Sequence, residues 1–155
     1  MDTTVLRAAY SELIAEARLG GFGDPPPGQW SAQQVIAHVA ANDELLAEAT
    51  RQVLDGSGRA YYNHDAIDTA RLDELIAEKG DVLAWLEETS ARLCDLADRL
   101  PEEDQTMVHT QIIDGTHTRV DQPWPWPKAL VVQAKVHLPA HLTQLIELRG
   151  QHDES

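Results

Sequence analysis

The chain has one cysteine, few basic residues and no long apolar run, and each shortage excludes a class of protein. Cys94 has no partner for a disulfide bond within the chain, so nothing in the sequence requires an oxidising compartment. No stretch approaches the roughly 18 apolar residues of a membrane span, and the N-terminus lacks a basic segment followed by an apolar one. We therefore expect a cytoplasmic protein with no membrane partner.

Basic residues are outnumbered: 12 lysines and arginines stand against 26 acidic residues, which gives a formal net charge of −14. A field of this sign repels phosphate backbones, and no basic stripe overcomes it locally, so we do not expect nucleic acid as a partner. The acidic residues are scattered along the expected helix faces rather than gathered in a tail. We interpret this charge as a solubility feature.

Length and apolar content predict one domain. A chain of 155 residues, 43% of them hydrophobic, can bury one core without disulfides or a second domain. We expect this domain to cover residues 1–150 and the polar residues 151–155 to form a disordered tail.

Helical spacing of apolar residues predicts the first two helices. The first covers residues 2–19 and stops at a pair of glycines. The second begins after Ser31, which forms a capping box with Gln34, and it runs to about Asp55.

Two further helices are expected in the second half of the chain. After a loop at 59–68, the third runs over 69–100, with Gly80 as a weak point rather than a stop. The fourth begins near Pro127 or Lys128 and ends at Gly150.

Between the last two helices the sequence no longer shows the helical spacing of apolar residues. Residues 107–121 contain two β-prone runs about an Asp-Gly turn, a strong signal for a hairpin. In segment 123–127 proline alternates with tryptophan, so this stretch is extended and cannot join a helix or a sheet interior. The predicted fold class is all-α, a four-helix bundle with a small β-hairpin between the third and fourth helices.

Three histidines lie inside apolar helical stripes. His137 and His141 are four residues apart, so their imidazoles project from one helix face, close enough to hold one metal ion. His38, in the second helix, is our candidate for the third ligand. A His-x-x-x-His spacing also arises by chance, so the pair alone does not decide the matter.

Several of these features occur together in one known superfamily. Trp30 leads a helix that carries His38 one to two turns later, an Asn-containing loop precedes the long third helix, and His137 and His141 lie near the C-terminus. Over roughly residues 30–149 the chain resembles the DinB/YfiT-like superfamily, which includes mycothiol-dependent maleylpyruvate isomerases and bacillithiol or mycothiol S-transferases. The resemblance implies a four-helix bundle, a metal held by the three histidines with open coordination positions, a mycothiol-like thiol, and a homodimer.

Two details qualify the resemblance. Pro139 lies between the two C-terminal histidines, where it removes a helical hydrogen bond and should kink or bulge the helix. The isomerase branch leads us to expect an acidic ligand in the last helix, whereas His137 and His141 are both histidines. The chain is therefore more similar to the S-transferase branch.

The chemistry of such a site follows from its ligands. Three neutral imidazoles leave a zinc, nickel or iron ion with a net positive charge and at least one open position. A thiol bound there loses its proton near neutral pH, and a bound water supports hydrolysis.

Residues just before the ligand helix are candidates for a substrate pocket. Trp124, Trp126, His109, His117 and Arg119 are placed to roof the site and bind an anionic co-substrate. A simpler interpretation is that the two histidines face water on the hairpin, which we favour, and that the tryptophans are a packing clamp.

Asn42, one turn after His38, is the remaining candidate. It either orients His38 through the ring nitrogen that does not face the metal, or it is a hydrogen-bonded polar group of the core. The sequence favours neither.

Two functional hypotheses remain. The first is a metal-dependent enzyme that transfers a low-molecular-weight thiol to an electrophilic substrate or uses the thiol in an isomerisation, with metal-dependent hydrolysis as a close neighbour. The second is a non-catalytic bundle whose histidines are a structural or vestigial cluster. An open coordination position would favour the first.

Overall fold

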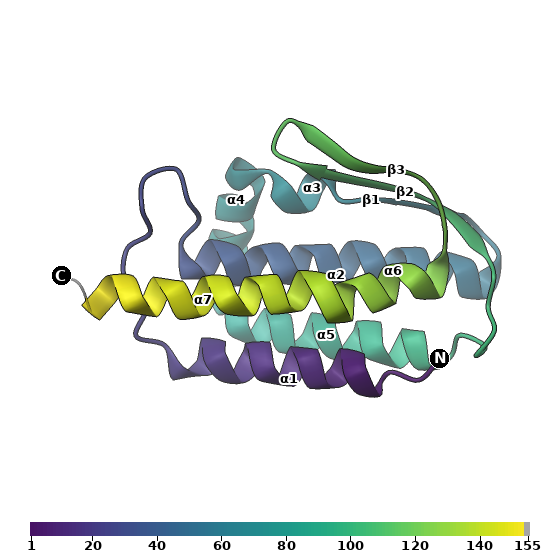
Figure 1. Ribbon diagram of the computed structural model, residues 1–155, viewed down its shortest axis with the longest axis horizontal. Helices are drawn as coiled ribbons and strands as arrows, with labels where there is room; N and C mark the ends of the chain where they lie inside the picture. Colours follow the sequence, from purple (N-terminus) through teal and green to yellow (C-terminus); the bar gives the residue numbers. More distant parts are fainter. Residues whose placement is uncertain (154–155) are drawn as a thin grey trace.

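The computed structural model describes residues 1–153, and its main body is a bundle of long helical segments (Figure 1). These are α1 (Thr4–Leu19), α2 (Ala32–Asp55), α5 (Val82–Asp98) and a continuous rod made of α6 (Trp126–Val132), η1 (Gln133–His137) and α7 (Leu138–Asp153). Apolar side chains at helical spacing, such as Leu13, Leu86 and Leu145, form the core between them. The predicted helical bundle is confirmed.

The ends of α2 are those expected from the sequence. The Ser31 hydroxyl accepts a hydrogen bond from the backbone N–H of Gln34, and the Gln34 side chain accepts one from the backbone N–H of Ser31. After Asp55, Gly56 adopts a left-handed conformation with φ of 73°, which residues with a Cβ avoid. Helix α1 likewise ends at the predicted glycine pair.

The prediction of one continuous helix over residues 69–100 is wrong, because this segment forms two helices. Helix α4 (Thr69–Lys79) ends at Gly80, whose φ is +72°, and α5 begins after Asp81, whose carboxylate accepts a hydrogen bond from the backbone N–H of Ala84. Glycine enters the left-handed region at no steric cost and aspartate is a strong helix cap. Together they stop a helix that apolar periodicity alone continues.

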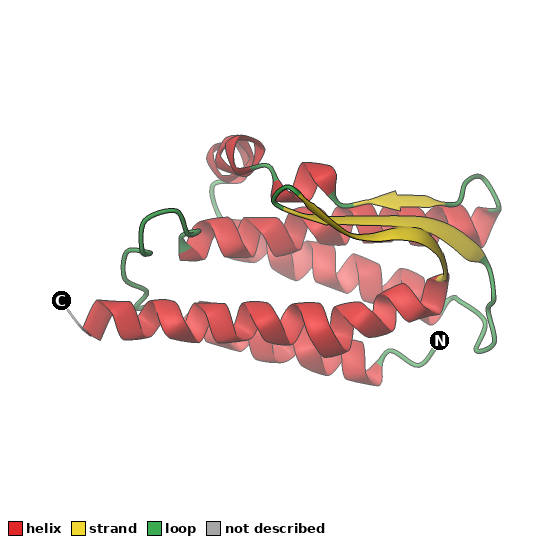
Figure 2. Cartoon of the chain, turned by 45° about the horizontal axis from the view of Figure 1, so that its top comes forward, coloured by secondary structure: helices red, strands yellow, loops and turns green. Residues whose placement is uncertain are grey.

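The predicted hairpin is present and belongs to a larger sheet. Strands β2 (Met107–Asp114) and β3 (His117–Pro125) pair antiparallel about the Asp-Gly turn. Within the described residues they form a three-stranded sheet in the order β1-β2-β3, where β1 is Ala60–Tyr62. Figure 2 shows this sheet in yellow on one side of the bundle. The Pro-Trp segment is the end of β3, an edge strand, and the start of α6. The prediction that it cannot join a helix is therefore wrong for Trp126 and Pro127, because the first turn of a helix tolerates proline.

The predicted loop at 59–68 is therefore more ordered than expected. It contains β1, which pairs parallel with β2, and the short helix α3 (His64–Ile67). The Asn63 side chain donates to the carbonyl of Ile113 at 2.9 Å and accepts from its N–H at 2.8 Å, which anchors this segment to the hairpin. Elements of three or four residues are too short for periodicity to reveal.

The bulge expected at Pro139 takes the form of a π-helical turn, η1, that ends two residues before it. Proline lacks an N–H, and its ring clashes with the carbonyl four residues earlier in a regular helix. The N–H of Leu138 bonds instead to the carbonyl of Gln133, five residues back, which widens the turn. The rod continues to Asp153, beyond the predicted end at Gly150, and residues 154–155 of the predicted tail lie outside the described residues. No helix within 1–153 is both long and apolar enough to cross a membrane.

Candidate metal centre

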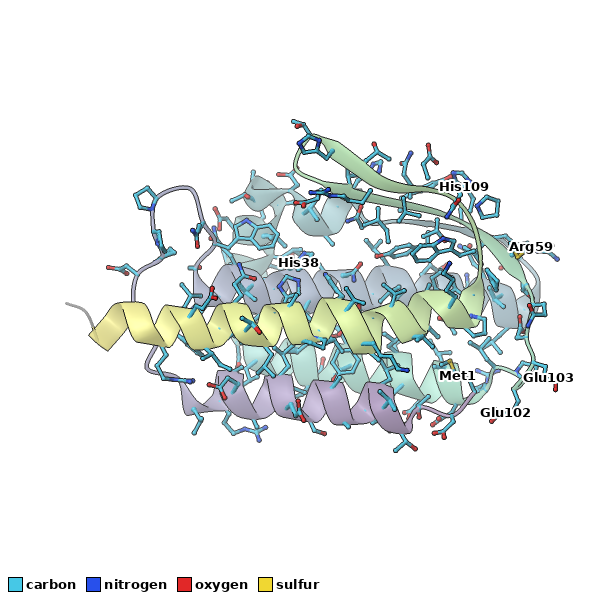
Figure 3. The ribbon with its side chains drawn as sticks, in the orientation of Figure 1. Met1, His38, Arg59, Glu102, Glu103 and His109 are labelled. Carbon is cyan, nitrogen blue, oxygen red and sulfur yellow. The ribbon has the colours of Figure 1, made fainter. Side chains whose placement is uncertain are left out.

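Three histidine side chains meet between α2 and the rod. His38 Nε2 lies 3.1 Å from His137 Nε2, and His141 Nε2 lies 3.0 Å from the same atom. One ring nitrogen from each residue lies within 4.8 Å of the corresponding nitrogens of the other two. Figure 3 shows His38 where α2 and α7 pass one another.

The other nitrogen of each ring is held by an oxygen acceptor. His38 Nδ1 lies 2.7 Å from the carbonyl oxygen of Ala66, His137 Nδ1 lies 2.8 Å from Gln133 Oε1, and His141 Nδ1 lies 2.9 Å from Gln144 Oε1. A carbonyl or amide oxygen accepts a hydrogen bond only from a protonated nitrogen, so Nδ1 carries the proton in each ring. All three Nε2 atoms are then unprotonated acceptors.

This donor set fits a transition metal. The Nε2 atoms of His38 and His141 lie 3.1 and 3.0 Å from His137 Nε2. Unprotonated nitrogens cannot hydrogen-bond to one another, and a cation between them would relieve their mutual repulsion. Tetrahedral Zn–N bonds of 2.0–2.1 Å place neighbouring nitrogens about 3.3 Å apart, close to the spacing found here. The held Nδ1–H groups are the arrangement that usually supports metal-bound histidines.

Burial keeps the three imidazoles neutral. Desolvation, followed by the neighbouring His141, lowers the pKa of His38 from 6.5 to about 4. Desolvation also lowers the pKa of His137 well below its ordinary value and that of His141 in the same direction. Metal ligation requires unprotonated nitrogen, so the cluster is ready for it near pH 7.

Two local structures aim the rings. The π-turn places Gln133 and His137 so that their side chains bond to each other across one turn of the rod. On the opposite side, α3 brings the carbonyl of Ala66 to His38, and the indole of Trp30 packs against the His38 ring with centroids 4.9 Å apart. Trp30, which leads this helix, therefore also covers the cluster.

A cavity of about 300 Å³ adjoins His38 and His137. Its wall comes from α2, the sheet and the rod, and most of it is apolar: Leu46, Ile112, Val120, Ala129, Val132 and Val136. Arg119 and Trp124 add polar groups to this wall. Trp124 Nε1 is, among the buried side-chain polar atoms that the structure describes, the one that lacks a hydrogen-bond partner.

Comparison with known proteins assigns the family. The sequence model of the DinB superfamily matches residues 5–145. This chain belongs to the DinB superfamily. The family predicted from Trp30, His38, His137 and His141 is thereby confirmed.

Solved structures similar to this DinB chain include the crystal structure of the mycothiol-dependent maleylpyruvate isomerase, with a TM-score of 0.69 and 20% identity over 92% of this chain and 58% of the other. A histidine-to-alanine mutant of that isomerase gives a TM-score of 0.68 at the same identity and coverage. The chain thus spans little more than half the length of these neighbours, and at this identity the likeness shows the shared fold. No curated protein gives a significant sequence match.

The predicted pocket residues of the DinB chain separate into two groups. Asn42, Arg119 and Trp124 line the cavity beside the histidines. Trp126 does not: it is fully buried in the core, where its Nε1 donates to the Thr50 hydroxyl at 2.9 Å. Trp126 therefore has the packing role that the sequence left open.

His109 and His117 lie away from the cavity, on the exposed parts of the hairpin. The His109 side chain is 44% exposed, and its Nε2 lies 3.0 Å from a carboxylate oxygen of Asp121. His117 is exposed at the start of β3. Figure 3 places His109 on the sheet, apart from His38. This is the arrangement that we favoured for both residues.

The idea that Asn42 orients His38 is wrong, because the carbonyl of Ala66 occupies His38 Nδ1. Asn42 instead accepts a hydrogen bond from the Tyr61 hydroxyl and lies 3.5 Å from Gln133 Oε1 through its Nδ2. It is a satisfied polar group at the cavity wall.

Four groups of the site were not predicted from the sequence: Ala66, Tyr61, Gln133 and Gln144. A signal existed for two of them. Gln133 lies four residues before His137 and Gln144 three residues after His141, which are the spacings at which helix side chains meet. Ala66 and Tyr61 lie in the short elements that gave no periodic signal.

Proposed function

We propose that this DinB protein is a metal-dependent enzyme that uses a low-molecular-weight thiol, mycothiol or a related compound, to act on an electrophilic substrate by S-transfer or isomerisation. One observation carries the proposal: three Nε2 lone pairs converge, with every Nδ1 already bonded, at the wall of a largely apolar cavity.

His38, His137 and His141 would hold a divalent ion such as zinc, nickel or iron, which three imidazoles bind while leaving a position open. When bound, such an ion supplies positive charge that lowers the pKa of a thiol beside it. The chain itself keeps the rings neutral by burial and aims them through Gln133 and Gln144.

The cavity favours one class of electrophile. Its apolar side chains from α2, the sheet and the rod would bind an apolar body and exclude water. Arg119 would attract an anionic group, in competition with Asp114, whose carboxylate lies 3.2 Å from the guanidinium. The unpaired Trp124 N–H would donate to a carbonyl or carboxylate oxygen, because a buried donor without a partner costs roughly 1–3 kcal/mol.

Two considerations support thiol chemistry. The similar solved structures belong to an enzyme named as mycothiol-dependent. The S-transfer form is favoured by the all-histidine ligand set, as argued from the sequence. A homodimer and a cytoplasmic location remain predictions, and light scattering of the purified chain tests the first.

The test begins with elemental analysis of the untagged protein purified without chelators. We expect about one transition metal ion per chain, lost in His38→Ala and retained in His109→Ala, the matched control for an exposed histidine. The loaded protein is then incubated with thiols and apolar electrophiles that bear a carboxylate, and products are followed by mass spectrometry. Thiol adducts or thiol-dependent isomers that require the metal are the expected result.

Other outcomes of these experiments would overturn the proposal or identify a different function. Absence of metal after zinc, nickel and iron have been added back overturns the metalloenzyme. Metal binding with thiol-independent ester hydrolysis would identify a hydrolase. Metal binding with neither activity, and with a fourth protein ligand in a spectrum of the cobalt form, would identify a structural cluster.

A further inference from the structure

Asp43 is a carboxylic acid in the centre of the bundle. The residue is fully buried, and within the described residues no salt bridge involves it. Its carboxyl oxygens accept hydrogen bonds from the Tyr10 hydroxyl of α1 and, at 2.9 Å, from the Thr89 hydroxyl of α5. Burying a negative charge with only neutral donors is costly, so a carboxyl group in these surroundings either keeps its proton or needs a positive charge nearby.

Hydrogen bonds connect Asp43 to the histidine cluster. His137 donates from Nδ1 to Gln133 Oε1 at 2.8 Å, Gln133 donates from Nε2 to the Tyr10 hydroxyl oxygen at 3.1 Å, and Tyr10 donates to Asp43. Each donor in this chain of bonds points toward the carboxyl group. A negative charge on Asp43 therefore strengthens each bond in turn and makes His137 a more electron-rich ligand.

Among the residues that the structure describes, none supplies a cation to the surroundings of Asp43. The titratable groups that act on it electrostatically are Tyr10 of α1, Cys94 of α5, Tyr61 of β1 and Glu44 of its own helix. The rod contributes the uncharged Gln133. Burial accordingly raises the pKa of Asp43 to about 8, although its two hydroxyl donors act in the opposite direction. Without a cation in the bundle, Asp43 is therefore mostly protonated at pH 7.

We propose that Asp43 is the charge partner of the metal centre: when the three histidines take up a divalent cation, the Asp43 carboxyl releases its proton to solvent and the carboxylate stabilises the cation through Tyr10, Gln133 and His137. The site gains two positive charges and loses one proton, and nothing is oxidised or reduced. Asp43 is a positioning residue, because it acts through His137. The inference rests on the proposed metal site and is independent of the thiol chemistry.

The experiment counts protons. Metal-free protein is titrated with zinc chloride at pH 7, by calorimetry in two buffers that differ in ionisation enthalpy, which reports both the dissociation constant and the protons released per zinc. We expect the natural chain to release up to one proton more than Asp43→Asn. We also expect the logarithm of its zinc affinity to rise more steeply between pH 6 and 8, by up to one unit per pH unit.

A matched pair of conservative variants keeps the test sharp if Asp43→Asn does not fold. Tyr10→Phe removes the hydroxyl that joins Gln133 to Asp43, whereas Thr50→Val removes another fully buried hydroxyl, which bonds to the Leu46 carbonyl and the Trp126 indole and lies outside the cavity. We expect Tyr10→Phe to release fewer protons and to bind zinc roughly 3- to 10-fold more weakly than Thr50→Val. Thr50→Val should match the natural chain in proton release.

Each remaining outcome separates the two proposals. Equal proton release by the natural chain and Asp43→Asn, or by Tyr10→Phe and Thr50→Val, overturns the role of Asp43 and leaves the metal site intact. Failure of the natural chain to bind zinc, nickel or iron overturns the metal site itself.

Discussion

The histidine cluster and the outer face of the hairpin use the same residue type in opposite ways. In the cluster, His38 is 4% exposed and its Nδ1 is held by a neutral oxygen acceptor, which leaves Nε2 free as a ligand. On the hairpin, the His109 side chain is 44% exposed and its Nε2 faces the carboxylate of Asp121. A buried ring with one oriented nitrogen is suited to bind a metal, whereas a partly exposed ring beside a carboxylate makes a surface contact.

The position of His109 in strand β2 explains why its side chain stays outside the cavity. In β2, Val108 and Thr110 are buried, while Met107 and His109 are not. Successive side chains of a strand point to opposite faces, so residues of even number here face the bundle and those of odd number face outward. His109 is excluded from the cavity by its place in this alternation.

The sharpest test of the comparison removes one histidine from each region. His38→Ala should weaken zinc binding by about 1,000-fold, because one of three ligands is lost and the site is no longer closed on the α2 side. His109→Ala should bind zinc as the natural chain does. Isothermal titration of the metal-free proteins measures both, and equal losses would contradict the assignment of the cluster.

The next largest effect extends the comparison to carboxylates. The pKa of Asp43 is raised from 3.8 to about 8 in the folded protein. Between these values the unfolded chain has lost this proton and the folded chain has kept it, so the contribution of Asp43 to stability is complete below pH 4 and is lost as pH rises toward 8. We expect this one group to lower the free energy of unfolding of the metal-free protein by about 5 kcal/mol across that range, because each pKa unit corresponds to about 1.4 kcal/mol.

Urea unfolding of the metal-free protein at pH 5 and pH 8 measures this slope. Asp43→Asn should lose less stability than the natural chain as pH rises, whereas Asp121→Asn, which removes an exposed carboxylate, should follow the natural chain. If the free energy of unfolding of all three proteins changed equally between pH 5 and pH 8, burial would not raise the pKa of Asp43.

A smaller effect on zinc affinity is expected when the hydrogen-bond acceptor of a histidine, rather than the histidine itself, is replaced. Gln133→Leu keeps the size of the side chain but removes the oxygen that holds His137 Nδ1. The ring then loses its fixed tautomer and aim, and zinc affinity should fall roughly 10- to 100-fold. Gln122→Leu on β3, away from the cluster, is the control, and unchanged affinity in Gln133→Leu would mean that the π-turn alone aims the ring.

The smallest effect belongs to the exposed pair. His109→Ala breaks the contact with Asp121 and should change the free energy of unfolding by less than about 1 kcal/mol, because water screens the pair on both sides. Thermal unfolding at pH 6 and at pH 8 measures it. A loss of several kcal/mol would show that the hairpin face is more tightly organised than its exposure indicates.

Local patterns predicted much of this molecule. The Ser31 capping box, the Asp-Gly hairpin turn and the distortion beside Pro139 all depend on bonds between residues a few positions apart, and all are present. The split at Gly80 was within reach of the same reasoning, because glycine followed by aspartate is a stop and a cap. Apolar periodicity was given too much weight there.

The sequence by itself determined that His137 and His141 share one helix face, because helix geometry depends only on their spacing. Only the tertiary structure decided that His38 meets them with its Nδ1 on the carbonyl of Ala66, and that Gln133 reaches Tyr10, 123 residues away. Such contacts depend on how all the elements pack together, including the short β1 and α3. A pattern of neighbouring residues does not predict that packing. The three histidines of the cluster could therefore be named from the sequence, whereas the groups that orient them required the fold.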